Sequence, residues 1–186
     1  MSLKLYGSVA SPFVRRIRSQ LQDQDYEFIQ INIFDHQDRE KLKKVSPHLR
    51  IPILVDAEKV LWDSTIIAEY LQNEPIPTDE KLNINLVNEM TDSGLLLFQI
   101  KKFKLDPQEE STLLSLQQSR ISNLLRYLEY QIEKLDERTK EWLFISLDWF
   151  EFRNVVDWKS NHPGIASFYE AFPQSKWLKK TDPRIS

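Results

Sequence analysis

The chain has 186 residues, of which 41% are hydrophobic and 28% charged, a composition typical of a globular protein with one large domain or two small ones. Its net charge of -3 argues against nucleic acid as the main partner, since phosphate binding requires a basic face. The absence of cysteine excludes disulfide frameworks, thiolate metal sites and Cys-x-x-Cys redox centres.

Metal, membrane and secretion signals are also missing from the sequence. The three histidines, His36, His48 and His162, lie far apart without the spacing of metal ligands, so we expect no metal site. No apolar run approaches the ~18 residues that span a bilayer. The first residues resemble a strand rather than the apolar segment of a signal peptide. We therefore expect a cytoplasmic protein with neither membrane nor nucleic acid as a partner.

A helix over residues 12–23 is predicted to follow a short strand at 4–6. Ser11 precedes Pro12, and this pair is typical of a helix N-cap and first turn. Apolar residues then recur at helical spacing. They are Phe13, Ile17 and Leu21.

The strand and helix patterns continue up to residue 75. Residues 28–33 alternate apolar and polar, as in a half-buried strand, and residues 38–45 form a charged helix. Residues 52–56 and 59–62 are predicted as a hairpin, and Ser64 as the cap of the next helix. This order implies a small mixed sheet flanked by helices, as in thioredoxin-like domains.

The segment Pro75-Ile-Pro-Thr-Asp interrupts the pattern and is typical of a linker. We therefore predict an α/β thioredoxin-like domain at 1–75, a linker at 76–81 and an all-α helical-bundle domain at 82–186.

The second domain is helical throughout in its periodicity. Long amphipathic helices are predicted at 82–103 and 109–135, and shorter helical segments at 142–158 and 163–172. The second long helix has an apolar stripe that favours a bundle core over a coiled-coil partner surface. The stripe comprises Leu114, Ile121, Leu124, Leu125, Leu128 and Ile132. A dense aromatic cluster is expected to be core rather than the lining of a ligand site. It comprises Trp142, Phe144, Trp149, Phe150, Phe152 and Trp158.

Ser11 is the main candidate for chemistry. At a helix start its hydroxyl lies near unpaired backbone N–H groups and the positive end of the helix dipole, both of which favour an anion. A charge-assisted hydrogen bond of roughly 1.5–3 kcal/mol would lower the pKa of a bound thiol by about one to two units. The alternative is that Ser11 is only an N-cap.

Two further segments offer groups for a small peptide. Only about 5–6% of X-Pro bonds are cis, but a cis Ile51–Pro52 bond would turn the Ile51 backbone toward an extended ligand. Asp63 offers a carboxylate for an ammonium group, and Ser64 with its neighbouring amides suits a carboxylate. Arg50 would pair with a second carboxylate. The alternatives are a plain cap for Ser64, a solvated acid for Asp63 and a surface charge for Arg50.

Taken together, three motifs resemble the amino-terminal domain of the serine-type cytosolic glutathione transferases. They are Ser11-Pro-Phe-Val-Arg-Arg, Arg50-Ile-Pro-Ile-Leu-Val and Asp63-Ser-Thr-Ile-Ile-Ala-Glu-Tyr-Leu. The resemblance covers about the first 75 residues well and the remainder more loosely. It implies glutathione as co-substrate, no metal, and a homodimer.

The resemblance assigns the thiol end of glutathione to Ser11, with Phe13 in the same motif. Ser8 is a rival activating hydroxyl, because some subfamilies place theirs earlier in the loop, and Tyr6 is a weaker one. Relatives that form a mixed disulfide have cysteine at the position of Ser11. A chain without cysteine is therefore limited to conjugation, peroxide reduction or glutathione binding.

The resemblance also assigns the rest of the glutathione peptide. Ile51, before a cis Pro52, would pair with the cysteinyl backbone. Asp63 and Ser64 would hold the γ-glutamyl end, and Arg50 the glycyl carboxylate.

The family pattern fails between Leu135 and Leu147. Relatives begin a buried helix there with a glycine-containing loop and a Ser/Thr-x-x-Asp capping box, and this segment has neither. We therefore expect a shortened helical domain, in which residues 142–145 repack the gap, and an altered electrophile pocket. The predicted function is a glutathione transferase-like enzyme whose bound thiolate attacks a small apolar electrophile. The alternative is a non-catalytic binding or regulatory protein of the same fold, akin to the transferase-like partner of bacterial RNA polymerase.

Overall fold

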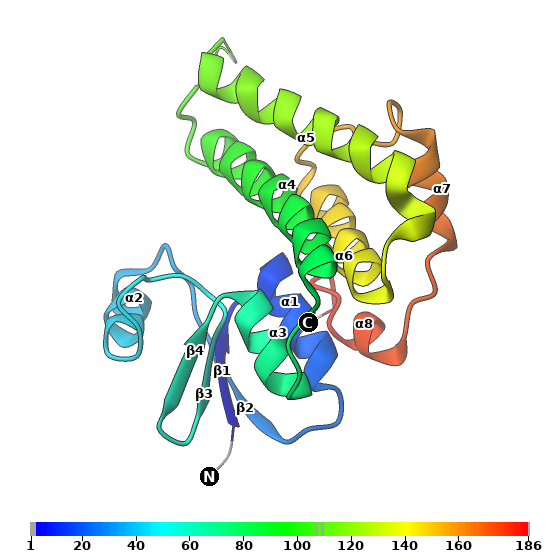
Figure 1. The fold of residues 1–186 in the computed structure, drawn as a ribbon. Coiled ribbons are helices and arrows are strands. Elements are labelled where there is room, and N and C mark those ends of the chain that lie inside the picture. The colour runs from blue at the N-terminus through cyan, green and yellow to red at the C-terminus, as the bar shows by residue number, and fades with distance from the viewer. Residues whose placement is uncertain (1–2, 107, 109, 186) are drawn as a thin grey trace. The chain divides into compact units, whose positions relative to one another are not determined.

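The computed structural model describes residues 3–106, 108 and 110–185, and its chain forms two compact units (Figure 1). One unit comprises Met1–Ile76 together with Gln174–Ser186, and the other comprises Pro77–Pro173. None of the helices in these described ranges is long and apolar enough to cross a membrane.

The two units correct the predicted boundaries at two places. Residues 174–186 were assigned to the helical domain, but they group with the first unit, in which α8 (Lys176–Lys180) packs on α1 (Pro12–Leu21). The buried Arg15 holds them there, because its Nη2 donates to the carbonyl oxygen of Leu178 at 3.0 Å. The predicted linker at 76–81 is also partly helical, since α4 already begins at Thr78.

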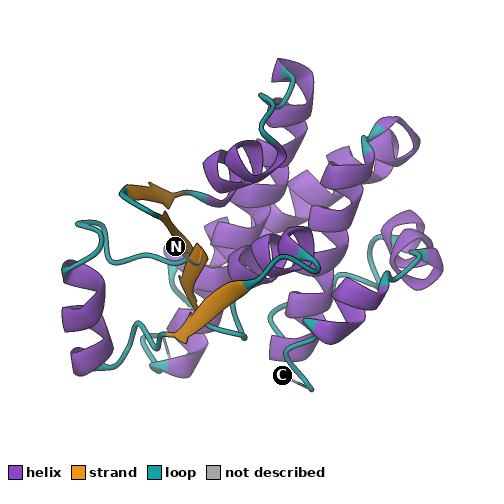
Figure 2. Cartoon of the chain, turned by 90° about the horizontal axis from the view of Figure 1, so that it is seen from below, coloured by secondary structure: helices purple, strands orange, loops and turns teal. Residues whose placement is uncertain are grey.

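The first unit is built on a four-stranded mixed sheet of order β2-β1-β3-β4 (Figure 1). Figure 2 shows strands of this sheet in orange. The β1–β2 pair is parallel, and the other two pairs are antiparallel. This is the predicted thioredoxin-like arrangement. The strands are β1 (Leu3–Gly7), β2 (Tyr26–Gln30), β3 (Ile53–Asp56) and β4 (Lys59–Trp62).

Helices cover both faces of this sheet. The helices α1 and α3 (Ser64–Gln72) pack together on one face, and α2 (His36–Lys43) lies on the other (Figure 1). The alternation of β3 explains the division, because successive strand residues point to opposite faces. Ile53 is buried in the cluster that includes Leu42 of α2, and its neighbour Leu54 is also fully buried.

The second unit is helical, as predicted, and α4 contacts both α5 and α6. Its helices are α4 (Thr78–Lys102), α5 (Thr112–Gln131), α6 (Glu137–Arg153) and α7 (Pro163–Ala171), with a 3-10 turn at Ile132–Lys134. The predicted segment 142–158 is wrong at its edges, since α6 begins at Glu137 and ends at Arg153. The preference for a bundle core is confirmed at Ile121, Leu125 and Leu128 of α5, which are buried.

The aromatic cluster is mainly core. Five of its six members are at most 3% exposed, and the sixth, Phe152, lies half-buried under the guanidinium of Arg153 at 4.3 Å. Phe144 stacks between Tyr169 and Phe172, with ring centroids 5.1 and 4.8 Å away. These ring contacts pack α6 against α7 and the residue that follows it.

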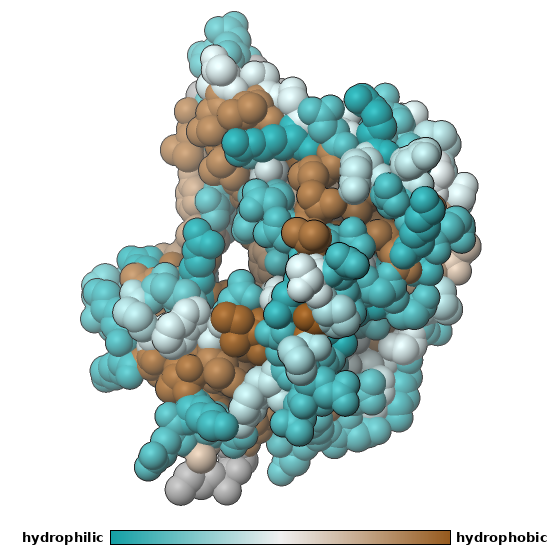
Figure 3. Space-filling model, viewed as in Figure 1, coloured by the Kyte–Doolittle hydropathy of each residue, from teal (hydrophilic) through white to brown (hydrophobic). Residues whose placement is uncertain are grey.

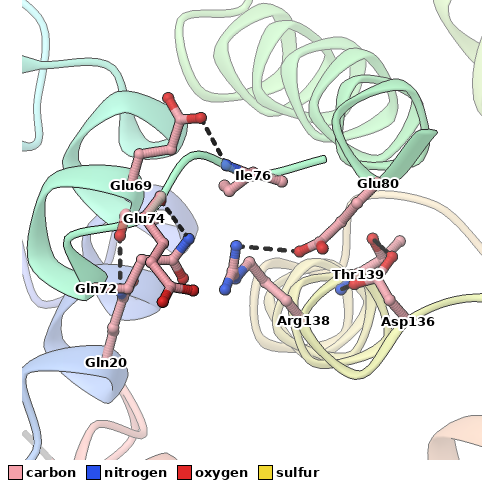
Figure 4. A network of polar contacts seen from close by, with 10 residues as sticks. Gln20, Glu69, Gln72, Glu74, Ile76, Glu80, Asp136, Arg138 and Thr139 are labelled. Atoms are coloured by element: carbon pink, nitrogen blue, oxygen red, sulfur yellow. Dashed lines mark hydrogen bonds and ion pairs between the residues drawn. The ribbon is translucent and has the colours of Figure 1, made fainter. Parts of the chain in front are cut away.

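The helix α6 has an N-cap, although its segment lacks the Ser/Thr-x-x-Asp pattern. The order of the two residue types is reversed, because the acid, Asp136, is the N-cap and Thr139 follows three residues later. Oδ1 of Asp136 accepts from the Thr139 backbone N–H at 2.8 Å, and Oδ2 accepts from the Thr139 hydroxyl at 2.7 Å (Figure 4). Arg138 in the same turn forms an ion pair with Glu80 of α4 at 3.0 Å. Residues 142–145 are all buried. The expected shortening of this domain stays a prediction.

Apolar side chains also gather on the surface of the second unit, where α4 ends and α5 begins (Figure 3). The exposed large apolar residues there are Phe103, Leu105, Leu113 and Leu116.

Candidate active site

The register of the sheet brings the three candidate segments to one end of the first unit. Tyr6 near the end of β1 pairs with Ile53 at the start of β3, and Ile53 pairs with Trp62 at the end of β4. The loop after β1, the turn before β3 and the residues after β4 therefore all leave the sheet at the same end. They carry respectively Ser11, the Ile51–Pro52 bond and the Asp63-Ser64 pair.

Ser11 is the N-cap of α1, as predicted. Its Oγ accepts from the backbone N–H of Val14 at 3.4 Å, and its own backbone N–H donates to the Ser8 carbonyl oxygen at 3.0 Å. Because Oγ acts here as an acceptor, its proton is not used by this contact and can be donated elsewhere. Ser8 uses its hydroxyl in the same way, accepting from Ala10 N–H at 3.3 Å. Both serines therefore stay candidates for activating a thiol.

Phe13 follows in the first turn of α1 and is half-buried. The guanidinium carbon of the buried Arg16 lies 4.7 Å from its ring centroid, a cation–π geometry that fixes the ring.

The peptide bond between Ile51 and Pro52 is cis, the isomer that the resemblance implied. Pro52 is buried, Ile51 is half-buried and Arg50 is exposed. The turn that carries them contains Leu49 in the left-handed region, with φ of 54°. An exposed arginine beside a backbone edge suits an anionic, extended ligand.

His48 is a site-adjacent residue that the sequence did not single out. Its Nδ1 lies 3.0 Å from the Ser46 hydroxyl and 3.4 Å from the Arg50 backbone N–H, and its ring packs edge-on against Trp62 at 5.6 Å. Burial, followed by the positive charge of Arg50, holds the pKa of His48 below its usual 6.5, although Asp63 acts in the opposite direction. His48 therefore joins the Arg50 turn to the end of β4. Only the spacing His-x-Arg-Ile-Pro was available as a signal.

The cap of α3 is Asp63 rather than the predicted Ser64. One carboxylate oxygen of Asp63, Oδ1, accepts from the backbone N–H groups of Thr65 and Ile66 at 2.8 and 3.3 Å. Asp63 has φ of 70°, an uncommon conformation for a residue with a side chain, and such outliers gather at functional sites. Among the described residues, Oδ2 has no hydrogen-bond partner, while Ser64 is 3% exposed.

The connection after α3 is held by side chains of that helix (Figure 4). Glu69 accepts from the backbone N–H of Ile76 at 2.8 Å, and Gln72 donates to the Glu74 carbonyl oxygen at 2.7 Å. These bonds fix the carboxyl end of α3, so that its amino end with Asp63 is presented from a rigid element.

Comparison with known proteins agrees with this arrangement. Residues 5–77 match the family model described as the glutathione S-transferase amino-terminal domain. The amino-terminal part of the chain is therefore similar to this glutathione S-transferase domain. The chain is also 28% identical over 200 residues to the uncharacterized GST-like protein YibF of Escherichia coli, covering 97% of this chain and 98% of the relative.

A plant relative matches a shorter part of the chain. Glutathione S-transferase U17 of Arabidopsis thaliana is 40% identical over 73 residues, and the match covers 38% of this chain and 32% of that protein.

Solved structures share the fold over nearly the whole chain. A glutathione transferase family member from Pseudomonas fluorescens, with bound glutathione, superposes with a TM-score of 0.85 at 23% identity, covering 98% of this chain and 99% of that one. A glutathione S-transferase from Methylobacillus flagellatus, with GSH bound, gives 0.79 at 23% identity, covering 98% and 100%.

Proposed function

We propose that the chain binds glutathione at the end of the sheet where β1 ends, and that its bound thiolate attacks a small apolar electrophile. The observation that carries the proposal is the cross-strand pairing of Tyr6 with Ile53 and of Ile53 with Trp62. Because of this pairing, the three glutathione-type motifs leave the sheet at the same end. Relatives of the same fold contain bound glutathione, which supports this choice of ligand.

Ser11 would stabilise the thiolate. Its Oγ already accepts the N–H of Val14, so the hydroxyl proton is available to the sulfur, and the amino end of α1 adds the positive end of a helix dipole. Together these would lower the thiol pKa by about one to two units. The nucleophile would then be largely ionised near neutral pH without a metal or a general base.

The remaining residues would position the peptide. The Ile51 backbone would pair with the cysteinyl unit, next to the cis bond to Pro52. Oδ2 of Asp63 would accept from the γ-glutamyl ammonium group, because Oδ1 is occupied by the helix cap. Ser64 and its amides would bind the γ-glutamyl carboxylate, and Arg50 would pair with the glycyl carboxylate.

The family resemblance extends this proposal beyond glutathione. It assigns the electrophile to residues of the helical unit, and it implies a homodimer in the cytoplasm. These features belong to the proposal and are tested separately, by conjugation assays and by the mass of the chain in solution.

Calorimetric titration of glutathione, paired with conjugation of 1-chloro-2,4-dinitrobenzene, tests the proposal. The wild-type chain is expected to bind one glutathione per subunit and to turn over. Ser11→Ala is expected to reduce kcat by about 10–100-fold while glutathione still binds. Ser115→Ala, which removes an exposed hydroxyl in the helical unit, is the matched control. Absence of glutathione binding by the wild-type chain would overturn the proposal, and binding without turnover would reduce it to a glutathione carrier.

A further inference from the structure

A cavity lies in the first unit, at the opposite end of the sheet from the glutathione motifs. Its volume is about 420 Å³, enough for a small organic molecule. Tyr26 in its wall pairs with Leu3 at the beginning of β1, whereas the candidate active site lies where β1 ends. Its lining comes from the end of α1, the start of β2 and α8.

The wall of this cavity carries a guanidinium, that of Arg18, which forms no ion pair with a described residue. Two of its nitrogens, Nε and Nη1, are buried without a hydrogen-bond acceptor among the described residues. Its guanidinium carbon lies 4.9 Å from the ring centroid of Phe28. A positive charge held against an aromatic ring and facing a cavity favours an anion as the occupant.

A second cation of the wall also lacks an acidic partner. Lys180 belongs to the last turn of α8, and its Nζ lies 5.2 Å from the ring centroid of Trp177, with no ion pair to a described residue. By contrast, the nearby Lys176 is already matched by Asp23 at 3.5 Å. Arg18 and Lys180 therefore place two positive charges on the wall, neither of them in an ion pair with a described residue.

The rest of the lining indicates a flat apolar body for the ligand. Three aromatic residues line the cavity, each of them half-buried, so that each presents part of a ring surface. They are Tyr26, Phe28 and Trp177.

We propose that this cavity binds a small aromatic carboxylate, with its carboxylate on Arg18 and Lys180 and its ring among Tyr26, Phe28 and Trp177. The site is separate from the glutathione site and does not depend on it.

The acidic groups on the rim limit the charge of the ligand. Asp25 lines the same cavity and has no ion pair with a described residue, and Asp23 retains its exposed pair with Lys176. A polyanion such as a nucleoside diphosphate would be repelled by these carboxylates. A single negative charge can pair with Arg18 and Lys180 and is repelled less by the two carboxylates than a polyanion is.

Calorimetric titration of the full chain with 2-naphthoate tests the proposal directly. We expect saturable binding of one molecule per chain with a Kd on the order of 0.1–1 mM, as its small size allows. Arg18→Met is expected to weaken binding about tenfold or more, and Lys180→Met about twofold to fivefold because that lysine is exposed. Arg126→Met and Lys179→Met remove exposed charges outside the cavity lining and serve as matched controls.

Three comparisons keep the outcome unambiguous. The neutral 2-naphthamide, titrated into the unaltered chain, is expected to bind at least tenfold more weakly, and this comparison holds even if Arg18→Met is unstable. Saturating glutathione and the Ser11→Ala variant are expected to leave naphthoate binding unchanged. Equal binding of the acid and the amide, loss of naphthoate binding in the presence of glutathione, or no saturable binding would each overturn the proposal.

Discussion

The hydroxyl of Tyr70 donates a 2.6 Å hydrogen bond to Oδ2 of Asp56. It joins α3, which begins at the Asp63 cap, to the end of β3, whose first residue follows Pro52. Lys59 lies over the same ring, with Nζ 5.0 Å from the centroid. This hydrogen bond therefore links the helix that begins at Asp63 to the strand that follows Pro52, two segments of the candidate active site.

Removing this hydroxyl should weaken the first unit. We expect Tyr70→Phe to lower the melting temperature by about 2–4 °C, measured by differential scanning calorimetry. Tyr127→Phe, at an exposed position of α5, is the control. An unchanged melting temperature in Tyr70→Phe would show that the bond contributes nothing to stability.

The same bond predicts an alkaline effect. The hydrogen bond to Asp56, followed by burial, raises the pKa of Tyr70 above its usual 10.0. A raised pKa stabilises the folded chain fully below the unfolded value, and this contribution is lost as pH rises through the folded value. Stability of the wild-type chain should therefore fall more steeply above pH 10 than that of Tyr70→Phe.

His48 predicts an effect on the acid side of neutrality. Burial and the charge of Arg50 lower its folded pKa below 6.5, so the unfolded chain binds the proton more readily. Its contribution is present above pH 6.5 and is lost as pH falls toward the folded value. Urea unfolding at a series of pH values should show a shallower decline for His48→Gln than for the wild-type chain. His36→Gln is the control, and an identical decline in His48→Gln would contradict the assignment.

The contribution of the Asp136 N-cap of α6 to stability can be measured directly. Asp136→Ala removes the acceptor of both the Thr139 backbone N–H and its buried hydroxyl, and should lower the free energy of unfolding by about 1–2 kcal/mol. Glu133→Ala removes an exposed acid from the preceding turn and should change it by less than about 0.5 kcal/mol. Equal effects of the two variants in chemical denaturation would mean that the cap does not stabilise α6.

Gly94 is required by the packing of α4 on α6. A Cβ at this position would overlap Cε1 of the fully buried Phe150. Helix propensity alone would make Gly94→Ala stabilising by ~1 kcal/mol, but overpacking typically costs 1–3 kcal/mol and should prevail. The double variant Gly94→Ala/Phe150→Leu should recover part of the loss. A single variant that is more stable than the wild-type chain would show that Phe150 moves aside freely.

Local sequence patterns were sufficient to predict the elements that depend on neighbouring residues. The pair Ser11-Pro12 predicted the start of α1, and the short apolar run after Pro52 predicted β3, because a cap and a strand segment depend on a few neighbouring residues. The structure places the three motifs at one end of the sheet through the pairing of β1 with β3, which the predicted element order did not specify.

Features that depend on distant partners were missed. The helix α8 is five residues long and is fixed by Arg15, whose partner Leu178 lies 163 positions away in the sequence. His48 contacts Trp62, and the next residue, Leu49, is in the left-handed region. A turn of this kind is usually indicated by a glycine, and the sequence has none at this position. The cap of α6 was not predicted for another reason: its acidic residue comes first and its threonine three residues later, the opposite order to Ser/Thr-x-x-Asp.

The central claim is that Ser11 activates a bound glutathione thiol, and ultraviolet difference absorbance of the thiolate, titrated with pH in the wild-type chain and in Ser11→Ala, tests it most directly. The account predicts that the wild-type chain lowers the thiol pKa by about one to two units and that Ser11→Ala loses this shift. An unshifted thiol in the wild-type chain would contradict the claim, and an equal shift in both proteins would transfer the role to Ser8.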